Sequence, residues 1–105
     1  MEQASCYQYF KEALIVWSFQ QSQGWFRDHA VRINCVAPGP VFTPILDDFV
    51  SILGPERVAA DSQRMTRPAL ADEVAAVIAF LCSDAARWVN GVNLPVDGGL
   101  AATYV

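Results

Sequence analysis

The chain has 105 residues, which is close to the usual size of one domain, and carries a net charge of −4 at pH 7. Its seven basic residues are spread along the sequence, which argues against the basic surface that a nucleic-acid partner requires. With 53% hydrophobic and 17% charged residues, the chain has more apolar surface than a small domain easily buries. We therefore expect part of that surface to contact a protein partner.

The cysteines Cys6, Cys35 and Cys82 are odd in number and widely spaced, which predicts neither a disulfide framework nor a metal site. We expect buried thiols in a reducing cytoplasm. The N-terminus lacks the basic and then apolar pattern of a secretory signal. The longest apolar run, 74–82, is far shorter than the roughly 18 residues of a membrane span, so the sequence predicts a soluble cytoplasmic protein without a membrane partner.

The first predicted elements are a helix and a strand. No Pro or Gly interrupts 5–23, whose apolar centre predicts a helix buried on more than one side and ending at Gly24. His29 is expected in a surface turn and is given no catalytic role. Segment 31–37 is rich in β-branched and apolar residues and runs into Pro38-Gly39-Pro40, which predicts a buried parallel strand followed by a loop.

The second half of the chain repeats the alternation of helix and strand. Segment 42–67 has weak periodicity, with short helical patterns at 45–50 and 56–63, and is predicted to be a lid or insertion. The clearest helix is 71–83, and a brief strand, 92–96, follows it. This order predicts an α/β fold with parallel strands. Two strands alone leave open edges, so the chain must continue elsewhere or assemble with copies of itself.

Tyr7 and Lys11 stand four residues apart, so that both side chains lie on one face of the predicted helix. An ammonium near a phenol favours the phenolate and lowers its pKa from about 10 toward the working range. The tyrosine can then exchange a proton while a hydride moves. The alternative for this pair alone is a tyrosine packed on the helix flank beside a solvated lysine.

Pro38 and Gly39 combine a fixed φ with the absence of a Cβ, which lets the backbone approach a flat ligand closely. Thr43 adds a hydroxyl a few residues later. Taken alone, these residues and the later Asp97-Gly98-Gly99 are more typical of tight turns than of a cofactor site.

The combination and order of these motifs resemble the short-chain dehydrogenase/reductase family from Tyr7 onward. The matching motifs are Tyr7-x-x-x-Lys11, Arg32-Ile-Asn34, Pro38-Gly39-x-Val41-x-Thr43, Asp72-Glu73-Val-Ala and Val96-Asp-Gly-Gly99. The resemblance implies the C-terminal part of a Rossmann-like doubly wound parallel sheet, incomplete on its own. It also implies NAD or NADP as the cofactor and a small-molecule alcohol or ketone as the substrate.

The resemblance implies a role for each matching residue. Tyr7 corresponds to the catalytic acid/base, and Lys11 to the residue that lowers its pKa and binds the nicotinamide ribose. The loop that receives the nicotinamide carboxamide corresponds to Pro38, Gly39, Val41 and Thr43. Segment 42–67 corresponds to the substrate lid, whose apolar side chains suit a bulky, ring-containing substrate: Phe42, Ile45, Leu46, Phe49 and Met65. Trp17 with the first helix, and the last helix and strand, correspond to surfaces that form dimers and tetramers.

Some family features have no counterpart in these residues. The glycine-rich phosphate loop, the catalytic serine and a structural asparagine of the family lie upstream of the tyrosine. Phe10 replaces the small or hydroxylated residue usual before the lysine, and we expect it to crowd the cleft. We therefore expect poor dinucleotide affinity and no activity from the isolated chain.

Three interpretations remain open. In the leading one, the chain is the C-terminal part of an NAD(P)-dependent alcohol or ketone oxidoreductase. In the second, it is a self-associating or regulatory module that performs no chemistry. In the third, the upstream half was lost by truncation or by a misplaced gene start. The family residue that selects NAD over NADP lies upstream, so these residues do not encode the cofactor preference.

Overall fold

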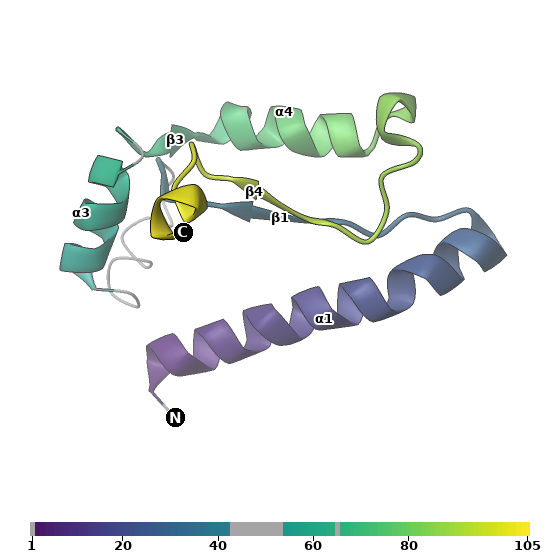
Figure 1. Ribbon diagram of the computed structural model, residues 1–105, viewed down its shortest axis with the longest axis horizontal. Coiled ribbons are helices and arrows are strands. Elements are labelled where there is room, and N and C mark those ends of the chain that lie inside the picture. The colour runs from purple at the N-terminus through teal and green to yellow at the C-terminus, as the bar shows by residue number, and fades with distance from the viewer. Residues whose placement is uncertain (1, 43–53, 65) are drawn as a thin grey trace. The chain divides into compact units, whose positions relative to one another are not determined.

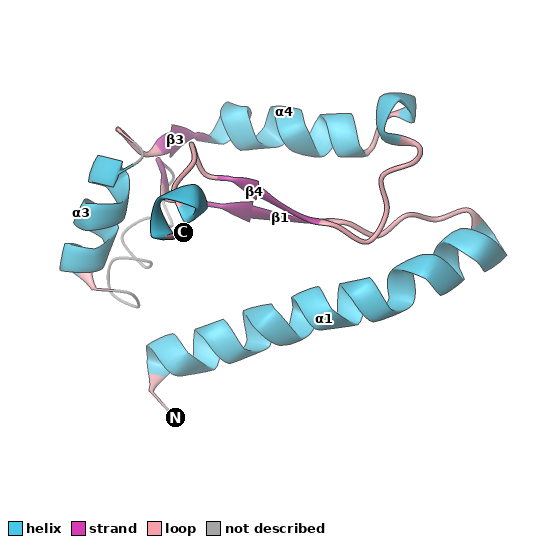
Figure 2. Ribbon diagram, in the orientation of Figure 1, coloured by secondary structure: helices cyan, strands magenta, loops and turns pink. Residues whose placement is uncertain are grey.

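The computed structural model describes residues 2–42, 54–64 and 66–105. The elements are α1 (Gln3–His29), β1 (Cys35–Pro38), β2 (Val41–Phe42), α3 (Pro55–Arg64), β3 (Ala69–Leu70), α4 (Ala71–Leu81), η1 (Asp84–Ala86), β4 (Asn93–Val96) and η2 (Ala101–Tyr104) (Figure 1). Strand β1 lies beside β4, and β2 lies beside β3. Neighbouring strands run in the same direction (Figure 2), which confirms the α/β class with parallel strands.

The chain forms two compact units. The first contains Met1–Val36 and Ile78–Leu94, and the second contains Ala37–Val77 and Pro95–Val105. Among the described residues, the buried apolar side chains are few: Leu81 and Ala86 in the first unit, and Val58 and Leu100 in the second.

Helix α1 is longer than the sequence predicted. It passes Gly24 and ends at His29, and the next residue, Ala30, has a left-handed φ of 57°. The Ala30 N–H donates to the Phe26 carbonyl, and the Val31 N–H donates to the Trp25 carbonyl. One glycine costs a helix about 1 kcal/mol, which the following turn of helix offsets, so the predicted stop at Gly24 was wrong. His29 was also misplaced in a turn, since it is the last residue of α1 and its ring lies 5.6 Å from that of Trp25.

The burial of α1 is the reverse of what its sequence suggested. The structure describes the whole of α1, and the buried residues of this helix are Ser18 and Ser22. Their hydroxyls donate to the carbonyls of Leu14 and Phe19 at 2.8 and 2.9 Å, so both buried polar groups are satisfied. The prediction of a helix buried on more than one side was therefore wrong, because its large apolar residues are exposed: Tyr9, Phe10, Leu14, Val16, Trp17, Phe19 and Trp25.

The predicted strand from residue 31 begins only at Cys35, because the preceding residues bind the loop before β4. The Asn34 side chain donates to the Val89 carbonyl at 2.9 Å and accepts from the Val92 N–H at 3.1 Å. The Arg32 guanidinium donates to the same Val89 carbonyl at 3.1 Å. The ladder between β1 and β4 starts one residue later, where the Cys35 N–H donates to the Val92 carbonyl.

The same loop is fixed to α1. The Asn90 side chain donates to the Ser22 carbonyl at 3.0 Å and accepts from the Ile33 N–H at 3.0 Å. Gly91 has a φ of +72°, and a Cβ built there lies 2.7 Å from the Ser22 hydroxyl. Only glycine fits this close approach without strain.

The second unit joins β2 and β3 in parallel register, with Val41 opposite Ala69 and Phe42 opposite Leu70. Within the predicted lid, the helical pattern at 56–63 is confirmed as α3, whereas the pattern at 45–50 lies outside the described residues. The C-terminal turn η2 binds α3. The Tyr104 hydroxyl donates to Asp61 at 2.7 Å, and the Arg64 guanidinium lies 4.3 Å from the Tyr104 ring centroid.

Helix α4 ends two residues before the predicted position 83, where the Ser83 hydroxyl donates to the Phe80 carbonyl at 2.6 Å. The three cysteines are free, as expected. Their expected burial was wrong for Cys82, which is exposed, while Cys6 and Cys35 are half-buried.

We expect Gly91→Ala to destabilise the chain by about 2 kcal/mol, because the new Cβ adopts a left-handed φ and displaces the Ser22 hydroxyl. The matched control is Gly24→Ala, at a helical position with open space around the Cβ, which should stabilise by about 0.5–1 kcal/mol. Urea unfolding of both variants measures the difference. Equal effects of the two substitutions would contradict the role given to Gly91.

Candidate functional site

Tyr7 and Lys11 lie together on α1, as their spacing predicted. The Lys11 ammonium is 5.5 Å from the centroid of the Tyr7 ring and lies over the ring. This arrangement is a cation–π contact, which places the charge near the aromatic ring. The lysine side chain is exposed, so its ammonium is accessible to a ligand.

The pKa of Tyr7 is raised above its ordinary value of 10.0, because partial burial desolvates the phenolate. The sequence argument expected the opposite direction from the nearby ammonium. Desolvation by burial is the cause of this shift.

Phe10, which was expected to crowd the cleft, has an exposed side chain that contacts Tyr9. Its side chain is 64% exposed, and its ring packs edge-on against Tyr9 with the centroids 5.3 Å apart. The contact of Phe10 with Tyr9 is on a surface rather than in a core.

The predicted cofactor loop belongs to the second unit. Pro38 ends β1 and is exposed, Gly39 is half-buried, and Val41 begins β2. The Pro40 carbonyl accepts the Ala69 N–H at 2.9 Å, which attaches the loop to β3. Thr43 lies outside the described residues. Because Tyr7 and Lys11 belong to the first unit, the joint use of the two groups stays a prediction.

Sequence reasoning missed a set of hydrogen bonds at the start of α4, from Arg67 and Leu70 to Glu73, which we call the Glu73 bracket. The Glu73 carboxylate accepts two hydrogen bonds from the Arg67 guanidinium, at 2.7 and 3.0 Å, and one from the Leu70 N–H at 2.8 Å. The sequence analysis had named Glu73 only as part of the Asp72-Glu73-Val-Ala motif. The available signal was its spacing, since a glutamate three residues after the N-cap position commonly reaches back to the N-cap N–H.

No three His, Cys, Asp or Glu side chains in 2–42, 54–64 and 66–105 converge to hold a metal ion. Within the same ranges, no helix has the length and apolar character needed to cross a bilayer.

The sequence matches known oxidoreductases over most of its length. Residues 1–101 match the family model described as enoyl-(acyl carrier protein) reductase. The coniferyl-alcohol dehydrogenase of Pseudomonas sp. (strain HR199) is 69% identical over 100 residues, which cover 95% of this chain and 39% of that protein. The levodione reductase of Leifsonia aquatica is 42% identical over 82 residues, which cover 72% of this chain and 31% of that protein.

Solved structures show the same relationship. The crystal structure of a levodione reductase has a TM-score of 0.74 and 36% identity, covering 90% of this chain and 38% of that one. A 4-hydroxyisoleucine dehydrogenase with bound NADH has a TM-score of 0.70 and 26% identity, covering 88% of this chain and 37% of that one. A Beutenbergia cavernae protein with bound NADP has a TM-score of 0.74 and 32% identity, covering 88% of this chain and 36% of that one.

These matches and the parallel α/β fold define a class of proteins whose members include dehydrogenases and reductases. The chain belongs to the short-chain dehydrogenase/reductase family. It spans less than half the length of the curated relatives that it matches.

The Glu73 bracket predicts a pH dependence of stability. Hydrogen bonds from Arg67 and then from the Leu70 N–H lower the pKa of Glu73 from 4.5 to about 2. A carboxylate with a depressed folded-state pKa stabilises the fold above its unfolded pKa, and the contribution is lost as pH falls. We expect Glu73→Gln to reduce the free energy of unfolding at pH 6, with the difference shrinking below pH 4.5 and vanishing near pH 2.

Denaturant unfolding of the two proteins across pH 2–6 measures this difference, with Asp72→Asn in the same first turn as the control. A direct NMR titration of the Glu73 carboxyl should give a midpoint far below 4.5. A midpoint near 4.5 would contradict the formation of these hydrogen bonds to Glu73 in solution.

Proposed function

We propose that the chain is the C-terminal catalytic portion of an NAD(P)-dependent dehydrogenase that oxidises a ring-containing alcohol of the coniferyl-alcohol type. The observation that carries the proposal is the 69% identity to a coniferyl-alcohol dehydrogenase over 95% of the chain. The relatives also include the levodione reductase and a 3-alpha-hydroxysteroid dehydrogenase/carbonyl reductase of Comamonas testosteroni, and the steroid in the second name supports a bulky substrate class. The three free cysteines favour a reducing cytoplasmic location.

In the proposed reaction, Tyr7 accepts the proton of the substrate hydroxyl as the carbinol carbon loses its hydride. The bound nicotinamide supplies the hydride acceptor. Lys11 is exposed and has three N–H donors, which suit ribose hydroxyls, and its charge favours the Tyr7 phenolate. Pro38, Gly39, Val41 and Thr43 would receive the carboxamide edge, and the exposed end of β1 at Pro38 fits that use.

The raised pKa of Tyr7 supports the idea that the isolated chain is inactive. Partial burial disfavours the phenolate in the chain by itself. A positively charged nicotinamide and a repositioned Lys11 ammonium would offset that effect in a complete site. The upstream family segments that bind the dinucleotide phosphates and donate to the reacting oxygen would be needed as well, and one such donor contributes about 10²–10³-fold in rate.

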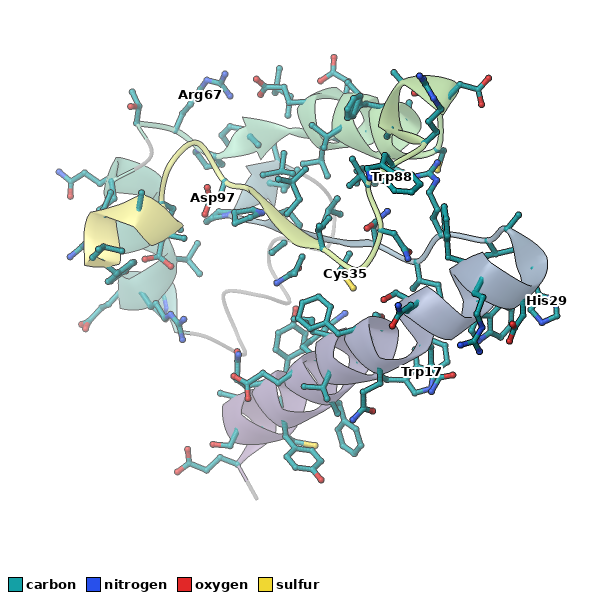
Figure 3. The ribbon with its side chains drawn as sticks, turned by 45° about the vertical axis from the view of Figure 1, so that its right-hand side comes forward. Trp17, His29, Cys35, Arg67, Trp88 and Asp97 are labelled. Carbon is teal, nitrogen blue, oxygen red and sulfur yellow. The ribbon has the colours of Figure 1, made fainter. Side chains whose placement is uncertain are left out.

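A second function, self-association, is favoured by the outer face of α1. Phe10, Leu14 and Trp17 follow the i, i+4, i+7 spacing of one helical stripe and are 64%, 54% and 49% exposed. Trp17 projects from α1 on the side away from Cys35 (Figure 3). Aromatic residues on such a stripe are typical of interface centres, and we propose that this stripe binds a second copy of the chain.

The catalytic proposal can be tested in a chimera that joins the upstream part of the Pseudomonas coniferyl-alcohol dehydrogenase to this chain. We expect it to oxidise coniferyl alcohol with NAD or NADP. Tyr7→Phe should lower kcat by about 10³-fold with little change in cofactor affinity, because only the proton acceptor is removed. The matched control is Tyr9→Phe, which removes the same hydroxyl from a 59% exposed neighbour.

Full activity of the Tyr7→Phe chimera, or an equal loss in the Tyr9→Phe chimera, would refute the assignment of Tyr7. The unfused chain should show no turnover under the same conditions. Measurable turnover by the unfused chain would refute the inactivity proposed for it.

Self-association can be tested with the double variant Phe10→Ser/Trp17→Ser. We expect the unsubstituted chain to be oligomeric and the variant to dissociate at least tenfold more readily, because two interface aromatics are removed. Sedimentation equilibrium measures the mass. The control is Gln20→Ser, a polar exposed position of the same helix, which should leave the mass unchanged. A monomeric unsubstituted chain would contradict this function.

A further inference from the structure

A continuous set of backbone and side-chain contacts links Glu73 to the loop that follows β1. The Glu73 carboxylate accepts the Leu70 N–H at 2.8 Å, and Leu70 lies opposite Phe42 in the β2–β3 pair. One residue earlier, the Ala69 N–H donates to the Pro40 carbonyl at 2.9 Å. Glu73 therefore binds β3, the same strand that is hydrogen-bonded to the Pro38–Val41 loop at Pro40.

Strand β3 is short, and Glu73 adds to the contacts that it makes with β2. It consists of two residues and is followed directly by α4, so the Leu70 N–H stands at the helix start, where backbone donors lack helical partners. The Glu73 carboxylate accepts a hydrogen bond from that donor. It also accepts two hydrogen bonds from Arg67, which precedes β3 in the chain. One carboxylate therefore binds both the residue before β3, Arg67, and the last residue of β3, Leu70.

The ion pair itself contributes little to global stability. The side chains of Arg67 and Glu73 are 56% and 44% exposed, and water screens such a pair. Its two parallel N–H···O bonds instead impose a fixed geometry, which a single-point contact cannot do. The bracket thus fixes the position of the backbone in addition to its modest contribution to stability.

We propose that Glu73 is a positioning residue for the Pro38–Val41 loop, acting through β3, and that it determines how well the dinucleotide is bound. This inference rests on the proposed function, in which that loop receives the nicotinamide. Glu73 touches no reacting atom in this role. Arg67 is its partner, because it orients the carboxylate toward the Leu70 N–H.

Three variants separate this role from a general loss of structure. Glu73→Gln keeps the size of the side chain but loses the charge that attracts Arg67. Arg67→Lys keeps the charge of the partner but loses the two-pronged contact. Asp72→Asn is the matched control, since Asp72 is the neighbouring carboxylate in the first turn of α4.

The first measurement is amide hydrogen exchange of the 105-residue chain, read at the Ala69 N–H. We expect this amide to be protected in the unsubstituted chain, since it donates to the Pro40 carbonyl. Glu73→Gln and Arg67→Lys should raise its exchange rate about tenfold, and Asp72→Asn should leave the rate unchanged. An unprotected Ala69 N–H in the unsubstituted chain would overturn the inference.

The second measurement uses the chimera described above. We expect Glu73→Gln to raise the KM for the dinucleotide about tenfold, with kcat changed less than threefold, because a misplaced loop weakens binding without removing a reacting group. Asp72→Asn should match the unsubstituted chimera. A general folding defect would instead lower the active fraction, so kcat per total protein would fall while KM stayed constant.

The outcomes distinguish this inference from the proposed function. A chimera that binds no dinucleotide before substitution would refute the proposed function, and the link from Glu73 to the cofactor would fall with it. An active chimera in which Glu73→Gln changes neither Ala69 exchange nor the dinucleotide KM would refute the positioning role alone. Faster Ala69 exchange with an unchanged KM would also refute it, because the loop position would not then govern cofactor binding.

Discussion

The first unit depends on the side-chain amides of Asn34 and Asn90. The loop before β4 has irregular backbone, and its polar groups must find partners other than a regular ladder. Asn34 pairs with both Val89 and Val92, and Asn90 connects the same loop to Ile33 and to the Ser22 carbonyl of α1. These bonds join the loop, the start of β1 and the helix that carries Tyr7 and Lys11. A mobile α1 would give neither residue a defined position.

The second unit uses the same principle with a carboxylate. Glu73 satisfies the donor at the start of α4, and through β3 it reaches the residues that follow β1. The family motifs of this chain therefore divide by physical role. The Arg32-Ile-Asn34 and Asp72-Glu73 motifs supply polar groups that pair irregular backbone, whereas Tyr7, Lys11 and the Pro38-Gly39 turn are the residues that we propose for proton transfer and ligand contact.

Helix α1 explains the excess of apolar residues in the composition. Its small serines face its own unit, and its aromatic residues face outward. Large exposed apolar stripes are uncommon on monomeric proteins and mark surfaces that other polypeptide covers. The chain spans 39% of its coniferyl-alcohol dehydrogenase relative, so family members have much more polypeptide available to cover such surfaces. The exposed stripe is the surface for which we propose self-association, and partial burial raises the pKa of Tyr7 on the same helix.

The sequence by itself determined the local features: the family, α3 and α4, and the contact between Tyr7 and Lys11. These follow from helical periodicity and four-residue spacing, which depend only on nearby residues. Tertiary structure decided the exposure of the α1 aromatics, the start of β1 at Cys35 and the direction of the Tyr7 pKa shift. Burial, desolvation and the partners of irregular backbone depend on residues distant in the chain, and a local pattern contains no record of them.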